Sequence, residues 1–130
     1  MENRERERKC KMKLFDREGK INFVDQNNVV LGYDTEQECC ETAGWFIRDE
    51  TYETVPDYYL EDDSGLDDWV FDPEYFQETG IDSDEGCMAI FRLVNGEKQK
   101  FLHLFNCHNG YYSHNFVFTN NNEILHRGDL

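Results

Sequence analysis

Short apolar runs separated by turn-forming residues dominate the last third of the chain. Asn95-Gly96 and Asn109-Gly110 each separate two such runs, and three asparagines at 120–122 separate another pair. Asn-Gly between alternating apolar runs is the strongest local signal of a β-hairpin, because both residues tolerate the positive φ angles of a tight turn. The sequence therefore predicts an antiparallel β-meander of four strands. These strands are expected at residues 88–94, 97–107, 111–119 and 123–126.

The hairpin predicted at residues 101–118 has a fixed register if Asn109-Gly110 is a two-residue loop. Phe105 then pairs with His114, and side chains alternate between two faces. One face is almost entirely aromatic, and we expect it to form the main core beneath a helix. The other face is apolar at its far end and polar beside the turn. The polar residues are Asn106, His108, Tyr111, Ser113 and Asn115.

Two kinds of site are conceivable on this hairpin. Its polar tip is a candidate for contact with a small ligand or a partner, the alternative being a solvated turn. Its aromatic face carries His103, Cys107 and His114, which are residue types that bind zinc. His103 and Cys107 are four strand residues apart, about 13 Å at roughly 3.3 Å per residue, which is long for ligands of one ion. Buried, hydrogen-bonded histidines are therefore the favoured interpretation, and binding of a metal or small ligand is the alternative function.

A second hairpin and one further strand are expected in the first half of the chain. Lys20–Asp25 and Val29–Tyr33 are strand-like runs, and Asn27-Asn28 between them is typical of a turn. Trp45–Ile47 is too apolar for a loop, so we expect it to re-enter the core as a strand.

One principal short helix is expected between these strands. Thr35 and Glu38 match a capping box, in which two side chains bond the free backbone N–H groups of a helix start. Gly44 is a natural residue to end the helix, because glycine readily adopts the left-handed conformation found there. The helix is therefore expected over about residues 35–43 and carries Cys39-Cys40.

The whole net charge of −15 belongs to one segment. Between Asp49 and Glu85 there are fifteen acidic residues and no Lys or Arg, and the other 13 acidic residues are balanced by all 13 basic ones. Aromatic residues also recur throughout the segment, whereas disordered acidic tracts are poor in them. We therefore expect residues 49–85 to dock on the domain as a partly helical excursion. Helical turns are expected at residues 66–71 and 73–78.

The acidic segment is the candidate interaction surface. Direct binding of nucleic acid is disfavoured, because phosphate recognition needs a basic footprint. A structured acidic surface could instead dock on a basic protein surface, or imitate a nucleic-acid backbone to occupy a binding channel. Simple solubility is the alternative. The residues expected to carry the interaction are Asp57, Glu61, Asp62, Asp63, Asp67, Asp68 and Trp69.

Enzymatic chemistry is not favoured by the sequence, and no cofactor is expected. The acidic neighbours of Cys39-Cys40 would raise a thiol pKa, which opposes a role as nucleophile. Gly65 and Gly86 lack the acidic residues that an EF-hand calcium loop needs at fixed offsets. The interaction hypothesis therefore stands first.

Length and composition indicate one globular domain at residues 14–130. It is preceded by a charged segment, residues 1–13, which is either a solvated helical turn or disordered. Apolar runs fall well short of the roughly 20 residues that span a bilayer, and the N-terminus lacks the apolar region of a signal peptide. Five cysteines, an odd count, do not form a disulfide framework. We therefore expect a cytoplasmic protein.

Two motifs resemble those of a group of small uncharacterised bacterial and phage domains. The motifs are Asp34-x-Glu36-x-Glu38-Cys39-Cys40-Glu41 and Leu104-x-Asn106-x-His108-Asn109-Gly110-Tyr111-Tyr112-Ser113-His114-x-Phe116. Members of that group pair a D-C-C-E-like helix with a late N-x-H-N-G-Y-Y-x-H hairpin. In this chain Glu38 stands where the motif has aspartate, and the long acidic segment is a departure from shorter members. The resemblance implies fold continuity and a phage or mobile-element origin, and it implies no activity.

These observations lead to one expected architecture. We predict an α+β domain with an antiparallel β-meander sheet, one principal short helix over about residues 35–43, and an acidic excursion over about residues 49–85. Its expected function is non-enzymatic docking on a basic protein surface.

Overall fold

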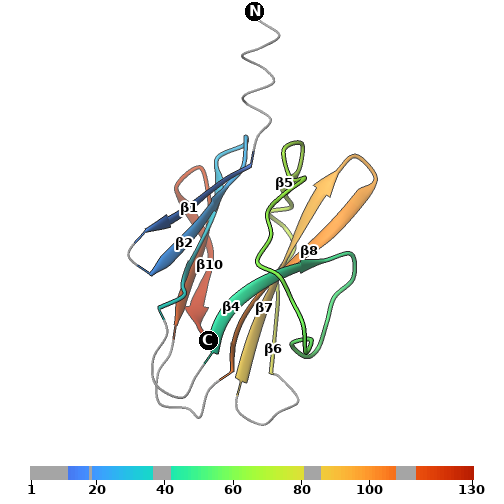
Figure 1. Cartoon of the computed structure of the whole chain (residues 1–130). Coiled ribbons are helices and arrows are strands. Elements are labelled where there is room, and N and C mark those ends of the chain that lie inside the picture. The colour runs from blue at the N-terminus through green and yellow to red at the C-terminus, as the bar shows by residue number, and fades with distance from the viewer. Residues whose placement is uncertain (1–11, 18, 37–41, 81–85, 108–113) are drawn as a thin grey trace, which may run out of the picture.

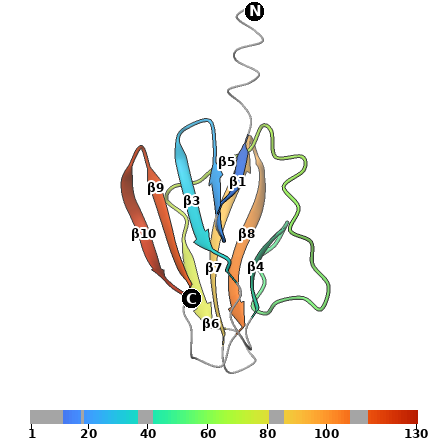
Figure 2. The same ribbon diagram turned by 60° about the vertical axis from the view of Figure 1, so that its left-hand side comes forward.

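The computed structural model of the chain is a sandwich of two antiparallel β-sheets (Figures 1 and 2). The structure describes residues 12–17, 19–36, 42–80, 86–107 and 114–130. Sheet A has the strand order β1-β2-β3-β9-β10, and sheet B has the order β4-β8-β7-β5, with β6 also pairing with β7. The strands are β1 (Lys13–Arg17), β2 (Lys20–Val24), β3 (Val29–Asp34), β4 (Thr42–Arg48), β5 (Val70–Phe71), β6 (Gln77–Gly80), β7 (Gly86–Asn95), β8 (Lys98–Cys107), β9 (Asn115–Asn120) and β10 (Glu123–Asp129).

The predicted α+β class is wrong, because the described part of the chain contains strands and no helix. The N–H and the hydroxyl of Thr35 both donate to the carbonyl oxygen of Gly19, at 2.7 and 3.0 Å, which links this residue to the start of β2. Gly44 lies within β4, where a Cβ atom would come within 3.1 Å of the Phe105 ring. It therefore allows close packing and does not end a helix. Residues 37–41 of the expected helix lie outside the described residues.

The two helical turns expected in the acidic segment are also wrong. The N–H of Trp69 donates to the carbonyl of Leu66 in a single turn, and β5 follows at once. The carboxylate of Asp72 accepts the N–H of Glu74 at 3.0 Å, and the chain then continues into β6. A carboxylate that bonds the backbone two residues ahead offers the chain a turn in place of a helix.

Three predicted hairpins are confirmed, and each has local turn chemistry. β2 pairs with β3, β7 with β8, and β9 with β10. Between β9 and β10, Asn121 and Asn122 both have positive φ angles, 51° and 73°, as a type I′ turn requires. Asn95 pairs with Lys98, so the β7–β8 turn is formed by Gly96 and Glu97, one residue later than expected.

The hairpin predicted around Asn109-Gly110 is wrong, because its two strands lie in different sheets. β8 lies between β4 and β7 in sheet B, and β9 lies between β3 and β10 in sheet A. Phe105 therefore pairs with Gly44 and Met88 and not with His114. The predicted turn itself lies outside the described residues. The physical reason is that β8 is buried on both faces, so it needs a neighbour on each edge and a layer on each side.

The buried hydrophobic residues form two clusters, one on each face of sheet B. The main core lies between the sheets and includes Leu102 and Leu104 of β8. A second cluster lies on the outer face of sheet B, where the acidic segment covers it. The β8 half of the aromatic face that was expected to form the main core is therefore buried beneath the acidic segment, whereas Phe116 and Phe118 of the β9 half do lie in the main core. The buried members of this outer cluster are Phe46, Met88, Ile90, Phe101 and Phe105.

Candidate functional site

The described part of the acidic segment, residues 49–80, packs in large part on the outside of sheet B, and its strands β5 and β6 pair with β7. In Figures 1 and 2 the chain between β4 and β5 runs along the side of sheet B that faces away from sheet A. The Tyr59 ring packs edge-on against Phe105, with ring centroids 5.2 Å apart, and Tyr75 packs against Phe101 at 5.6 Å. Tyr52 and Val55 are also packed on this cluster. The prediction that the segment docks on the domain is therefore confirmed.

Part of the same segment inserts into the main core. Leu66, Trp69 and Phe71 are all buried there. The carboxylate of Asp25, at the end of β2, accepts the N–H of Phe71 at 2.8 Å and also the N–H groups of Asn27 and Val29 at 2.9 Å. Asp25 is itself buried, so this carboxylate joins a turn of sheet A to the acidic segment.

His103 fixes the start of the acidic segment. It is completely buried, and its ring stacks on Phe46 with centroids 4.3 Å apart. Its Nε2 accepts the N–H of Tyr52 at 3.0 Å, and its Nδ1 lies 3.1 Å from the carbonyl oxygen of Phe101, to which it donates. Burial lowers the pKa of His103 to about 4, so the ring is neutral at pH 7.

Two arginines of sheet B hold the segment further along. Arg48 donates to the carbonyl oxygen of Tyr58 at 3.2 Å. Arg92 donates from Nε to the Asp72 carboxylate at 3.0 Å, and its Nη2 also contacts that carboxylate; its guanidinium group lies 5.0 Å from the centre of the Tyr75 ring. The hydrogen bonds from Arg92 lower the pKa of Asp72. The acidic segment is therefore docked by cations as well as by aromatic rings.

Glu61, a predicted interaction residue, has a structural contact. Its carboxylate accepts the N–H of Trp45 at 3.3 Å on the open edge of β4. Burial raises the pKa of Glu61, although the bond from Trp45 opposes this shift. Covering a free strand edge with a charged side chain also discourages edge-to-edge pairing with other chains.

The remaining predicted interaction residues divide into two groups. Trp69 is only 7% exposed and lies under the amino group of Lys100, so little of its ring is accessible to a partner. Beside the acidic residues, the segment exposes two large apolar side chains, Tyr58 at 75% and Leu60 at 54%. Sequence reasoning missed both, although their position between Asp57 and Asp62 was a usable signal. The exposed acidic residues are Asp57, Asp62, Asp63, Asp67 and Asp68.

The predicted polar tip is not assembled in the described part of the structure. Asn106 is completely buried, and its amide donates to the carbonyl oxygen of Leu130 at 3.0 Å. Asn115 is exposed at the start of β9 in sheet A. His108, Tyr111 and Ser113 lie outside the described residues.

The predicted metal ligands are separated by the fold. His103 and Cys107 belong to sheet B and pack with its outer aromatic cluster. His114 is buried beside sheet A, where its Nδ1 lies 2.7 Å from the carbonyl oxygen of Asp34. Burial also raises the pKa of the Cys107 thiol, which favours the unreactive protonated form. Among the described residues, no group of three or more His, Cys, Asp or Glu side chains is placed to hold a metal ion.

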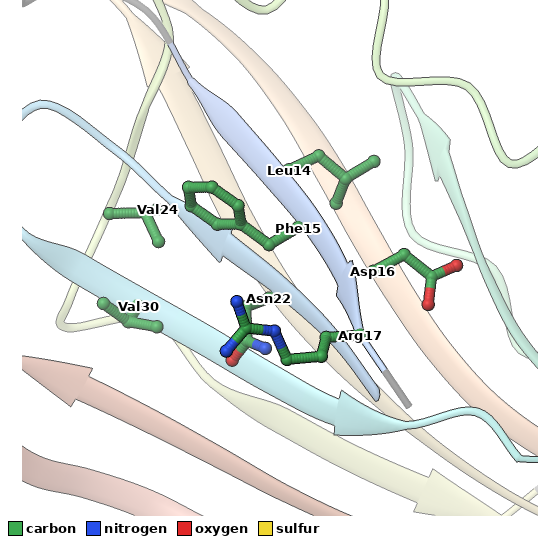
Figure 3. A pocket seen from close by; sticks show the side chains of 7 residues that line it. All are labelled: Leu14, Phe15, Asp16, Arg17, Asn22, Val24 and Val30. Carbon is green, nitrogen blue, oxygen red and sulfur yellow. The ribbon is translucent and has the colours of Figure 1, made fainter. Parts of the chain in front are cut away.

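A second surface, which the sequence did not point to, lies on sheet A. A hollow of about 550 Å³ opens there beside the edge strand β1. Figure 3 shows Phe15, Val24 and Val30 on one side of the sheet, whereas Leu14 and Asp16 point the other way. Phe15 is 52% exposed. The only sequence signal was the position of Phe15 between the basic residues Lys13 and Arg17.

Comparison with known proteins found no relative of this chain. No family model, no curated protein and no solved structure matches the chain. Within the described residues there is also no helix of the length and hydrophobicity needed to cross a lipid bilayer.

Proposed function

We propose that the protein is a non-enzymatic interaction domain whose acidic segment docks on a basic surface of a partner protein. One observation carries this proposal: the acidic side chains are presented from an ordered layer, with Tyr58 and Leu60 exposed among them. A solubilising acidic tail would not need aromatic anchors, a buried histidine and two arginines to hold it in place.

The composition of this surface fits protein recognition. Interfaces are typically organised around a few aromatic or apolar anchors surrounded by a polar rim. Tyr58 and Leu60 are suited to be such anchors, and Asp57, Asp62 and Asp63 surround them in the sequence. Acidic residues steer a basic partner and make association fast and sensitive to salt. A partner whose basic surface is a nucleic-acid channel is included in this proposal.

The proposal is tested by capture of partner proteins on the immobilised chain at two salt concentrations. We expect the captured proteins to be basic, and their binding to weaken strongly between about 0.05 and 0.5 M salt, because the Debye length falls to a few ångströms. Binding that does not depend on salt would contradict the proposal. Competition by duplex DNA would then distinguish a nucleic-acid channel from any other basic surface.

A pair of matched variants separates a local surface from net charge. D57N/D62N/D63N removes three exposed acidic groups beside Tyr58 and Leu60, and the new amide at position 62 keeps an oxygen for the bond from the Ser64 N–H. E36Q/E97Q/E123Q removes three exposed acidic groups outside the segment. We expect the first variant to lose most of the captured protein and the second to retain it. Equal losses of captured protein by the two variants would mean that binding depends on net charge and not on this part of the segment.

A further inference from the structure

Large exposed apolar side chains fall on two surfaces of the described structure, and these surfaces differ in charge. Tyr58 and Leu60 lie on the acidic segment. Phe15 and Ile124, which are 52% and 51% exposed, lie on the outer face of sheet A. Exposed apolar side chains grouped with charges of one sign are typical of contact sites between proteins.

The register of sheet A shows which residues share the face with Phe15. Directly paired residues of antiparallel strands lie on the same face. Phe15 pairs with Asn22, Asn22 with Gly32, Gly32 with Val117, and Val117 with Arg127. Gly32 at the centre of this row has no side chain, and the side-chain oxygen of Asn22 occupies the space beside it, 2.8 Å from where a Cβ of Gly32 would be.

The neighbouring rows add apolar walls and positive charge. One row runs from Lys13 through Val24, Val30 and Thr119 to Ile124. On the other side of Phe15, Arg17 pairs with Lys20, which pairs with Asp34. The lining of the hollow is apolar at Leu14, Phe15, Val24 and Val30 and polar at Asp16, Arg17 and Asn22. Lys13, Arg17 and Lys20 add positive charge at the β1–β2 edge of a protein whose net charge is −15.

We propose that this hollow binds residues 57–63 of a second copy of the chain, with Tyr58 or Leu60 seated against Phe15. Charge complementarity supports the choice of occupant, because Asp57, Asp62 and Asp63 would face Lys13 and Arg17. The volume of the hollow, about 550 Å³, lies within the range of about 300–1,000 Å³ that holds small ligands, and it suits one or two side chains. The inference rests on the proposed function in one respect, since it uses the same acidic segment.

The contact is made between copies and not within one chain. The hollow opens on the face of sheet A that points away from sheet B, whereas the acidic segment packs on the face of sheet B that points away from sheet A. Because the two surfaces lie on opposite sides of the sandwich, two copies cannot make both contacts with each other, so the association is head-to-tail and extends into a ring or an open chain of copies. The overall repulsion between copies is screened beyond about 8 Å at physiological salt, so close contacts decide the outcome.

Head-to-tail binding makes a specific prediction for mixtures of two variants. F15S/R17E disables the hollow, and Y58S/D62K disables the segment; all four side chains are exposed, so each variant is expected to fold. In sedimentation velocity at about 0.15 M salt, we expect the average mass of the wild type to rise with concentration and each variant alone to stay monomeric. An equimolar mixture of the two variants should form a dimer and nothing larger, because each variant keeps one intact surface.

The controls separate this inference from the proposed function. K98E/Q99S changes two exposed residues at the β7–β8 turn and should associate as the wild type does. A wild type that stays monomeric, or a mixture without dimers, would overturn the inference. If capture of a basic partner still depended on Asp57, Asp62 and Asp63, the proposed function would survive that result. If the wild type is monomeric and F15S/R17E no longer captures a protein that the wild type captures, the hollow binds that other protein. This result would also overturn the inference.

Discussion

The two sheets of this sandwich have similar inner faces and very different outer faces. On β8 of sheet B, the residues from Phe101 to Asn106 are all buried, because the acidic segment covers the outer side. On β3 of sheet A, buried and partly exposed residues alternate strictly, as expected for a sheet with one open face. The same sandwich therefore has one face closed by its own chain and one face with an apolar hollow.

The closed face shows how an acidic segment can become part of a fold. Aromatic rings supply the buried area, and Arg48 and Arg92 supply hydrogen bonds to the segment's carbonyl and carboxylate oxygens. The open face has the same kinds of residue, and no other described segment covers them: Phe15 is aromatic, and Lys13 and Arg17 are cations. An acidic segment that carries aromatic residues therefore complements the chemistry of either face, and in the described part of one chain it covers sheet B.

The largest expected difference between the faces is in core packing. Phe46→Ala removes a completely buried ring that contacts His103, Tyr52 and Tyr59, and should lower the free energy of unfolding by about 3–5 kcal/mol. Phe15→Ala on the open face should change it by less than about 0.5 kcal/mol. Urea denaturation of both variants measures the difference. Equal losses would mean that the outer face of sheet B is not covered in solution.

The link between sheet A and the acidic segment is expected to be nearly as important. Asp25→Ala removes the acceptor of three backbone N–H groups, two of them in buried bonds, and should cost about 2–4 kcal/mol of unfolding free energy. Asp25→Asn keeps one oxygen and should lose less. Thermal denaturation checks both variants, and an unchanged Tm for Asp25→Ala would disprove the link.

The buried histidine predicts how stability depends on pH. The folded protein holds the pKa of His103 near 4, below its ordinary value of 6.5, so the unfolded chain binds the proton more readily between these values. The contribution of neutral His103 to the free energy of unfolding is therefore complete above about pH 6.5. It is lost as the pH falls towards 4, by at most about 3 kcal/mol. His103→Gln should remove this part of the pH dependence. Denaturation curves at pH 7, 5.5 and 4.5 for both proteins would show it, and parallel curves would refute it.

The smallest expected effect concerns the half-exposed cations. Arg92→Ala loses a partly exposed ion pair with Asp72 and the contact with the Tyr75 ring, for a cost of about 1 kcal/mol. Arg127→Ala, on the open face, should be neutral within about 0.5 kcal/mol. The cost at Arg92 should shrink in 1 M salt, and a cost that is independent of salt would assign it to packing alone.

Local chemistry allowed part of this fold to be predicted. The turns at Asn27-Asn28, Gly96-Glu97 and Asn121-Asn122 each lie between strands that pair, so neighbouring residues were sufficient to predict these hairpins. The docking of the acidic segment was also predictable, because its aromatic residues need burial. Long-range partners such as Arg48 for Tyr58 were not, since a basic residue carries no sign of the carbonyl group it will bind.

The errors share one physical cause, which is that sheet membership depends on both faces of a strand. Phe101 and Phe105 on one side of β8 and Leu102 and Leu104 on the other already showed that this strand needs cover on both faces. A hairpin register considers one face at a time, and so it placed His103 and His114 together, whereas His103 lies in sheet B and His114 lies beside sheet A, just before β9. The expected helix is wrong at its described C-terminal end for a related reason: Thr42 and Ala43 pair with β8 as part of β4, and such pairing outweighs local helix signals.

Hydrogen exchange of individual amides tests most directly whether the acidic segment is a fixed layer on sheet B. The N–H of Tyr52 donates to the buried ring of His103, and the N–H of Phe71 donates to the buried carboxylate of Asp25. We predict that both amides exchange at least about 100-fold more slowly than in an unfolded chain, and that they share the protection of β7 and β8. Exchange of both at the unfolded rate, with β7 and β8 still protected, would show that the segment is not docked and would contradict this account.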